Sequence, residues 1–415
     1  TEQKDYYSII WPQLVLEEEK TNYQKKVDFG LIFIPNEGSD PYMNAKEFFW
    51  LEESSIGFRW GMGRRKITWS QLDSDWGLGV WQPVLAYNYL RPIEQGTLGL
   101  FFDFDKKDHK FQFSISPYTI PSQTAKISEQ DGFVQSSNRW FVDPISDLGL
   151  NGVKTNIKYS LEFPSFMEII SHPSVATSYY TTFQSSHWWF RASLAYKPMN
   201  HLHLYVKQPT LKSSLTDSYI DVEVVPAVLY HSLATIESGF INENLEGYIS
   251  LSVDQPENTP LEDVWLEMPT NKTYILGSKG RFRLSNLGWS RSFVSLAAFK
   301  IIDETGNDQG LVTPKDDSFS DIEITFDRYK FRDAVSLGIE IGSEKYLGLY
   351  GDIKMLKSFS AQGEALIANI KYSWTQQWQA FLELDVIGHD SYEGQSFFNK
   401  YRTNDSVSGG VKYVF

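Results

Sequence analysis

Apolar and polar residues alternate along most of the chain, which is the pattern of β-strands with one apolar and one polar face. The clearest unit has a bulky apolar residue at every second position on both sides of a polar turn at residues 105–108: Leu98, Leu100, Phe102, Phe104, Phe111, Phe113 and Ile115. This unit predicts a β-hairpin. Helical periodicity is hard to find anywhere in the sequence.

The same alternation recurs in other parts of the chain. It runs through residues 56–63, and residues 188–206 predict a second hairpin that turns at Pro198, Met199 and Asn200. Residues 366–386 predict a third hairpin around Thr375, with Trp374 and Trp378 on either side of its turn. Tryptophans in such positions are typical of anchors at a membrane interface.

Segments of about ten alternating residues, separated by turns, are what tilted membrane-spanning strands require. We therefore predict an all-β fold, a transmembrane antiparallel up-and-down β-barrel of about 18 strands (16–20), with residues 1–415 as its single domain. Six polar stretches are predicted to be loops: 35–46, 117–152, 164–186, 254–272, 303–318 and 387–404. No stretch approaches the roughly 18 apolar residues of a transmembrane helix.

The segment from Ile67 to Gln95 has two interpretations. It could fold into the barrel as a constriction loop, with Asp73, Asp75, Trp76 and Trp81 narrowing a pore, or it could form an extra hairpin. Residues 80–90 are the place where a strand could have been missed. The sequence does not decide between these interpretations.

Composition favours a membrane barrel over a soluble domain. Aromatic residues make up 15% of the chain, with 13 Trp, 23 Tyr and 28 Phe, although the mean hydropathy is only -0.34. Aromatic girdles together with a polar lumen account for both values. The net charge of -14 argues against nucleic acid as a partner. The absence of cysteine excludes thiolate metal sites and disulfides.

The end of the chain carries the first family resemblance. Residues 406–415 place small or polar residues on one face and apolar residues on the other, including Val411, Tyr413 and the terminal Phe415. This segment resembles the last strand of bacterial outer-membrane barrels. The resemblance implies an assembly signal, formed by these three residues, that is read by the barrel-insertion machinery. It also implies outer-membrane lipid as a partner.

A second resemblance lies between two strand-like stretches. Gly63, Arg64 and Arg65 are followed by Trp69, Asp73 and Trp76, and then by the sequence Trp81-Gln82-Pro83. The pattern is similar to one seen in porin-like and polysaccharide-export barrels. Arg65 stands where that pattern usually has Gln. The resemblance implies no particular substrate.

The residues between the apolar ones should face the lumen, and their charges suggest a function. We predict basic pore-lining residues in the first half of the chain: Arg59, Arg65, Lys158, Arg191, Lys197 and Lys207. We predict acidic ones in the second half: Asp321, Glu323, Asp327, Glu340, Asp352 and Glu383. Opposed basic and acidic walls would orient hydrated solutes in a diffusion pore. Alternatively, these groups only pair with their neighbours.

Catalysis and metal binding have little support. His201 and His203 share one strand face but lack an evident third ligand, so we predict no metal and no cofactor. His231 and Ser232 are adjacent and point to opposite faces of a strand. A hydrolase would need a histidine within hydrogen-bonding reach of Ser or Asp at the rim. We expect that the protein is not an enzyme.

The leading hypothesis is therefore a porin-like channel for hydrophilic solutes in the outer membrane of a Gram-negative bacterium, from whose mature chain a signal peptide has been removed. A plugged lumen would argue against it. The alternative is an exporter or scaffold in an envelope complex for polysaccharide secretion or motility, with partners in that complex or a second copy of the chain. Large periplasmic or lipid-facing apolar patches that hold partners would favour the scaffold.

Overall fold

A computed structural model describes most of the 415 residues. The described ranges are 9–20, 22–35, 41–55, 57–150, 153–183, 186–213, 218–257, 264–267, 270–284, 291–304, 311–312, 324–325, 328–342, 348–375, 377–390 and 396–413.

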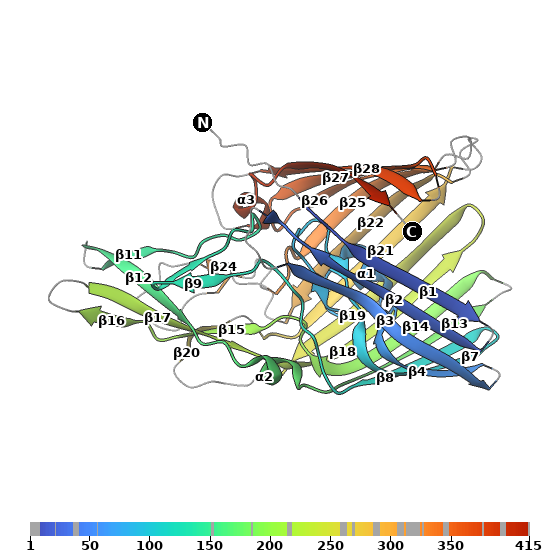
Figure 1. Cartoon of the computed structure of the whole chain (residues 1–415), viewed down its shortest axis with the longest axis horizontal. Helices are drawn as coiled ribbons and strands as arrows, with labels where there is room; N and C mark the ends of the chain where they lie inside the picture. The colour runs from blue at the N-terminus through green and yellow to red at the C-terminus, as the bar shows by residue number, and fades with distance from the viewer. Residues whose placement is uncertain are drawn as a thin grey trace.

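One large antiparallel sheet forms the body of the protein (Figure 1). In the described part of the chain it has 17 strands. They are β1 (Gln13–Lys20), β2 (Tyr23–Ile32), β3 (Tyr42–Ser55), β4 (Phe58–Arg65), β7 (Thr97–Lys106), β8 (His109–Ser116), β13 (Ser174–Phe183), β14 (Trp188–Pro198), β18 (Tyr230–Ile241), β19 (Leu245–Pro256), β21 (Thr273–Arg283), β22 (Phe293–Asp303), β25 (Asp333–Gly342), β26 (Leu349–Ser358), β27 (Gly363–Ser373), β28 (Trp378–His389) and β29 (Ser406–Tyr413).

Each of these strands pairs with the next one along the chain, so the sheet is an up-and-down meander. The hairpin predicted around residues 105–108 is β7 and β8, with Phe102 opposite Phe113. The hairpin predicted around Thr375 is β27 and β28, with Tyr372 opposite Ala380. Both predictions are confirmed.

Short and long connections between the strands lie at opposite ends of the sheet. Those after β1, β3, β7, β13, β18, β21, β25 and β27 are short and lie at one end, which we call the short-turn end. Most of those at the other end, the long-loop end, are long and carry further structure, such as residues 66–96 between β4 and β7. Short and long connections alternate, as an outer-membrane barrel requires.

The two faces of the sheet have opposite chemical character. On β18, His231, Leu233, Thr235 and Glu237 are buried and point inward, whereas Ile236 points outward and is 54% exposed. Many inward groups are polar or charged, beside an apolar cluster that includes Leu233, Ile275 and Phe299, and many large apolar side chains are exposed on the outside. A water-soluble sheet would place these residues the other way round. The arrangement fits lipid outside and polar groups inside.

The predicted fold class, an all-β transmembrane barrel, is therefore confirmed, with a strand number close to the predicted 18. Figure 1 shows the strands running obliquely, with α1 (Gln71–Trp76) among them. The final strand also behaves as predicted, since Val411 and Tyr413 are exposed on the apolar face. Phe415 lies outside the described residues, and the role of this strand as an assembly signal stays a prediction.

A second sheet projects from the long-loop end (Figure 1). Its strands come from the long connections: β11 (Asp147–Leu150), β12 (Val153–Leu161), β15 (His203–Lys207), β16 (Thr210–Ser213), β17 (Ser218–Ala227) and β20 (Val264–Glu267). Strands β12 and β17 pair in parallel. Ile157, Ile220 and Trp265 belong to its own apolar core. We call it the projecting sheet.

Shorter elements make up the rest of the described secondary structure. Within the described residues there are three small antiparallel pairs of strands: β5 (Val84–Leu85) with β6 (Ile93–Glu94), β9 (Ser128–Gln130) with β10 (Phe133–Gln135), and β23 (Leu311–Val312) with β24 (Ile324–Thr325). Two further helices are α2 (Phe166–Ile170) and α3 (Phe397–Lys400). Among the described residues, the helices are all too short or too polar to cross a membrane.

Three sequence predictions are wrong. The second hairpin at residues 188–206 does not form, because β15 pairs with β17 and β20 of the projecting sheet. The predicted loop at residues 164–186 contains β13, whose alternation is masked by small residues and threonines. Residues 80–90 do not form a barrel strand and contain only the two-residue β5.

The outward face makes a testable prediction about lipid contact. Leu251 lies near the middle of β19 between Ile236 and Leu276, and all three side chains are exposed. Leu251→Arg should lower the free energy of unfolding by about 2–4 kcal/mol in bilayers, because a cation at this depth leaves water. Chemical unfolding in vesicles measures the change. Leu211→Arg, on β16 of the projecting sheet, should have almost no effect; equal effects would argue against membrane insertion.

Candidate functional site

Residues 66–96, which we call the inner segment, leave the wall after β4 and return to it at β7. Within it, Ser70 caps α1 by accepting a hydrogen bond from the Asp73 amide at 3.2 Å. The helix ends at Gly77, whose φ of 56° is a left-handed conformation that glycine adopts without strain. The segment lies inside the barrel and adds no hairpin to the wall, although its two-residue strands β5 and β6 pair within it. Its predicted role in narrowing a pore stays a prediction.

Glu237 on β18 anchors the beginning of α1. Its buried carboxylate accepts hydrogen bonds from the amides of Gln71 at 2.8 Å and Leu72 at 3.2 Å, and from the hydroxyl of Ser70 at 2.9 Å. Arg191 on β14 donates to the same carboxylate at 3.1 Å. The negative charge therefore meets both the free amides of a helix N-terminus and a guanidinium.

Asp73 organises the turn that follows the helix. Its carboxylate is buried and accepts from the amides of Val80 at 2.9 Å and Trp81 at 3.0 Å. The indole of Trp81 in turn donates to Thr235 on β18 at 3.0 Å. These bonds hold Trp81 against the wall, so Asp73 supports the shape of the segment.

The inner segment is also tied to the remaining wall. Asp75 forms an ion pair with Lys279 on β21 at 2.9 Å and accepts from the hydroxyl of Tyr248 on β19 at 2.6 Å. Further along, Arg91 pairs with Asp385 on β28 at 2.9 Å. The contacts reach strands that are far apart in the sheet, so the wall surrounds the segment.

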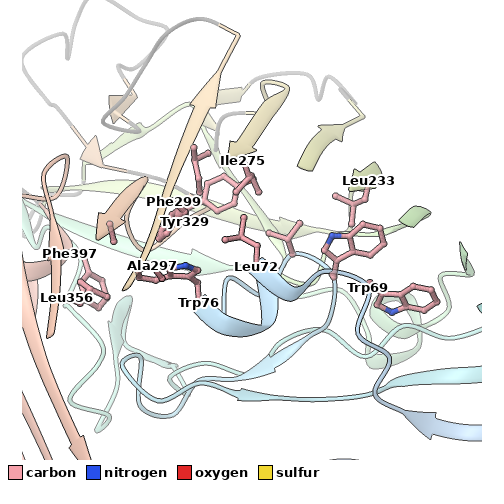
Figure 2. Packing of buried hydrophobic residues seen from close by; sticks show 14 of the residues in the cluster. Trp69, Leu72, Trp76, Leu233, Ile275, Ala297, Phe299, Tyr329, Leu356 and Phe397 are labelled. Carbon is pink, nitrogen blue, oxygen red and sulfur yellow. The ribbon is translucent and has the colours of Figure 1, made fainter. Parts of the chain in front are cut away.

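An apolar layer accompanies these polar contacts. Figure 2 shows Leu72 and Trp76 beside side chains of the wall, among them Ile275 and Phe299. The rings of Trp76 and Phe299 are 4.7 Å apart. Among the described residues the layer has 24 buried members; besides Leu72, Trp76, Ile275 and Phe299 they include Trp69, Val80, Trp81, Trp140, Leu233, Ala297, Leu356, Ala365, Ile387, Phe397 and Phe398. This packing across the lumen argues against a permanently open pore.

A charged chamber lies on the other side of the layer, toward the short-turn end. Three cavities of about 290, 210 and 500 Å³ make up the chamber. The first two share Asp75 and Lys279, the last two share Arg281, and the first and third share Glu340. Arg281 pairs with both Glu246 and Glu340. The three cavities therefore adjoin one another, and the chamber that they form carries both signs of charge.

The residues predicted to form the basic lining are divided between the wall and the projecting sheet. Arg59 and Arg65 point inward and both approach Asp103, the latter at 2.7 Å. Lys197 is buried and donates to Asn200 at 2.6 Å. Together with Arg191, these residues pair with neighbouring groups, as the alternative interpretation held. The prediction for Lys158 and Lys207 is wrong, because β12 and β15 belong to the projecting sheet.

The predicted acidic wall is interrupted by basic residues. Glu340, Asp352 and Glu383 lie on β25, β26 and β28, and the first two line the chamber. Strands β21, β26 and β27 carry inward lysines and an arginine: Lys279, Arg281, Lys354 and Lys371. The charges are interspersed in the described strands: Glu246 lies opposite Arg281, whereas the acidic Glu340 and Asp352 lie opposite each other. Asp321, Glu323 and Asp327 lie outside the described residues.

Some residues that hold the site were missed by the sequence analysis. Glu237, Asp103 and Lys279 each occupy a polar-face position of a strand, which was the available signal. Nothing in the sequence shows that Glu237 would meet residues more than 160 positions away. Asp73, Asp75, Trp76 and Trp81, which were singled out, all lie in the inner segment inside the barrel.

A histidine cluster at the long-loop end meets part of the condition set for a hydrolase. His231 lies 2.8 Å from Asp254, which also pairs with Arg328 at 3.1 Å. However, Ser232 is exposed on the opposite face, and the cavity beside Asp254 has only about 10 Å³. That space holds at most one water molecule. Within the described residues no group of three His, Asp or Glu could hold a metal ion.

Neither a protein-family model nor a curated protein matches the chain. Solved structures do match. OccK11 of Pseudomonas aeruginosa is 7% identical over 93% of this chain and 86% of that one, with a TM-score of 0.47. A variant of the Rh. blastica porin is 10% identical over 99% and 91%, with a TM-score of 0.38.

Wzi of Escherichia coli also matches, with 8% identity over 97% of this chain and 76% of that one and a TM-score of 0.46. It is described as an outer-membrane protein involved in group 1 capsule assembly and as a carbohydrate-binding β-barrel. All three likenesses are of structure, at 7–10% sequence identity. At such low identity the likeness concerns the fold, and no residue role is transferred.

The Glu237 anchor predicts a large loss of stability on mutation. Glu237→Ala should lower the free energy of unfolding by about 3–5 kcal/mol, because Arg191 and the amides of α1 lose a buried partner. Denaturant unfolding in detergent or vesicles measures this change. Glu246→Ala is the matched control, since its pair with Arg281 faces the open chamber; it should cost about 1 kcal/mol or less. A small effect at both positions would contradict the anchor.

The base of the projecting sheet should be sensitive to acid. His203 is fully buried, neither ring nitrogen has a partner within the described residues, and burial lowers its pKa to about 4. Its neutral form stabilises the fold above pH 6.5, and this contribution is lost as the pH falls toward 4.

By pH 5 the loss should be about 2 kcal/mol for wild type and absent for His203→Leu. Amide exchange of β15 at pH 7 and pH 5, corrected for intrinsic rates, tests this. The same acid sensitivity in both proteins would contradict it.

Proposed function

We propose that this protein is a porin-type channel of a bacterial outer membrane for hydrophilic solutes, closed at rest by the inner segment. The observation that carries the proposal is the charged chamber, which leads from the short-turn end to the inner segment. A barrel with this many strands is wide enough for an aqueous path once the segment is displaced.

The interspersed charges of the chamber suit small polar solutes. Arg281 lies between Glu246 and Glu340, and Lys354 lies 4.3 Å from the ring of Trp76. Because both signs line the same wall, the field changes direction over short distances and favours neither cations nor anions strongly. Hydrated dipolar or zwitterionic molecules are the solutes that such a lining accepts best.

The connections suggest an orientation. Short turns of outer-membrane barrels face the periplasm, and the longer loops face outward. With this orientation the chamber opens to the periplasm and the projecting sheet lies outside the cell. The inner segment would then separate the chamber from the outer opening.

The closed state should be strongly favoured. Moving the inner segment breaks the contacts of Glu237, Asp75 and Asp385 and exposes the apolar layer. The ion pairs of Asp75 and Asp385 are partly buried, so each costs less than the roughly 3–5 kcal/mol of a fully buried pair, but all of these contacts would be lost together. Opening would therefore need a solute or partner that offsets this cost, so the channel should not conduct spontaneously.

The second candidate is the exporter or scaffold in an envelope complex for polysaccharide secretion or motility. Two observations favour it: the apolar layer across the lumen, and the projecting sheet, whose edge strand β16 is exposed along its length. An exposed edge strand offers backbone groups to a partner protein. A scaffold would use the barrel as an anchor and would need no open lumen.

Planar-bilayer conductance distinguishes the two candidates. Arg65 and Thr97 face each other across β4 and β7, so residues 66–96 can be replaced with an Asn-Gly turn that leaves the wall intact. The channel proposal predicts that wild type is silent and that the shortened protein gives large, steady current steps. Ser74→Ala, which removes only a hydrogen bond to Glu94, is the control and should stay silent.

Silence of a correctly folded shortened protein, verified by a strand-rich circular dichroism spectrum, would contradict the channel and favour the scaffold. Steady steps from wild type would contradict closure at rest.

A further inference from the structure

Residues 162–172 connect the projecting sheet to the barrel and carry α2, none of whose residues is buried. Phe166 is 70% exposed, Met167 is 56% exposed, and the nearby Phe163 is 51% exposed. Three neighbouring large apolar side chains in contact with water are costly, because each loses the stabilisation of burial.

The sequence around α2 favours a helix over an irregular loop. Ser165 and Glu168 make a complete capping box, in which each side chain binds the backbone amide of the other. Pro164 precedes the cap and Pro173 follows the helix, at positions where proline bounds a helix. Because Glu168 is used in the cap, the remaining four residues of α2 form a surface that is apolar throughout.

Contacts place α2 at the rim of the barrel, at the long-loop end. The amide of Thr119, just after β8, donates to the carbonyl of Ile170 at 2.9 Å. The ring of His172 lies 5.7 Å from that of Tyr230 at the start of β18. Tyr230 in turn stacks on Tyr196 near the end of β14. Rings of this kind mark the level of a membrane interface.

The lipid-facing wall continues directly below these rings. A groove of about 410 Å³ opens on the outer surface beneath Tyr196, formed by side chains of β13, β14, β18 and β19. Its lining is mostly apolar and includes Val175, Leu194, Ala234 and Val253. Val175 is only one residue beyond the start of β13, so the groove and α2 are adjacent.

We infer that residues 162–172 insert into the membrane at the rim, with Phe163, Phe166 and Met167 among the lipid acyl chains. The partner is the lipid itself, because the apolar surface of α2 continues the outward-facing apolar wall of the barrel. Short apolar elements of this kind bind at the boundary between headgroups and acyl chains. The inference does not depend on whether the lumen conducts.

The anchor has a structural consequence for the projecting sheet. Strand β12 ends at Leu161, immediately before this segment, and β13 begins at Ser174 immediately after it. Insertion would therefore fix one end of the projecting sheet at the membrane surface. The sheet would keep a defined height and direction relative to the bilayer.

Single cysteines test the inference cleanly, since the chain contains no cysteine. Phe166→Cys is labelled with an environment-sensitive fluorophore, and the folded protein is reconstituted into phosphatidylcholine vesicles with brominated acyl chains. The result expected is a blue-shifted emission and a loss of fluorescence as large as that of Leu194→Cys on the lipid-facing wall. Leu211→Cys on β16, whose side chain is 62% exposed, is the matched control and should not be quenched by brominated lipid.

Quenching of the Phe166→Cys label by aqueous iodide but not by brominated lipid would overturn the inference. Protection from both quenchers would also overturn it, because it would show that a protein covers α2. Met167→Cys repeats the measurement at a neighbouring position. A circular dichroism spectrum like that of wild type shows that each variant has folded.

Discussion

The position of the inner segment depends on one buried carboxylate, that of Glu237. It accepts hydrogen bonds from the first amides of α1 on one side and from Arg191 on the other. Because either partner left alone in this place would cost several kcal/mol, wall and segment specify each other. Trp76 reaches Phe299 on β22 only from a helix held there, so the apolar layer and the chamber below it follow from this contact.

Two parts of the protein are in contact with different surroundings, lipid around the wall and water around the projecting sheet. Its wall meets lipid, so the large apolar side chains point outward and the polar groups pair inside. The projecting sheet meets water and keeps an ordinary apolar core around Ile157 and Ile220. The boundary between the two regimes runs through residues 162–172, where exposed apolar side chains sit beside the ring cluster of Tyr196 and Tyr230. A chain of this design is fixed in the membrane at its rim as well as along its wall.

The strands of the wall could be predicted from the sequence because each one separates lipid from the polar interior. This separation produces an alternation with a period of two, as at Leu100, Phe102 and Phe104. The same alternation led to the wrong hairpin prediction at Leu202, Leu204 and Val206, because it shows that a strand has two unlike faces but not which sheet the strand joins. Ion pairs such as Arg65 with Asp103 depend on strand register, which sequence leaves open. The meeting of Ser70 with Glu237, 167 positions apart, had no local signal at all.

Amide hydrogen exchange of the reconstituted protein tests the central claim, that residues 66–96 form a packed closure held to the wall. The amides of Gln71, Leu72, Val80 and Trp81 bind carboxylates inside the barrel. They should exchange as slowly as the amides in the middle of β18 and β19. Exchange at the rate of a free loop, while the strands stay protected, would contradict the account.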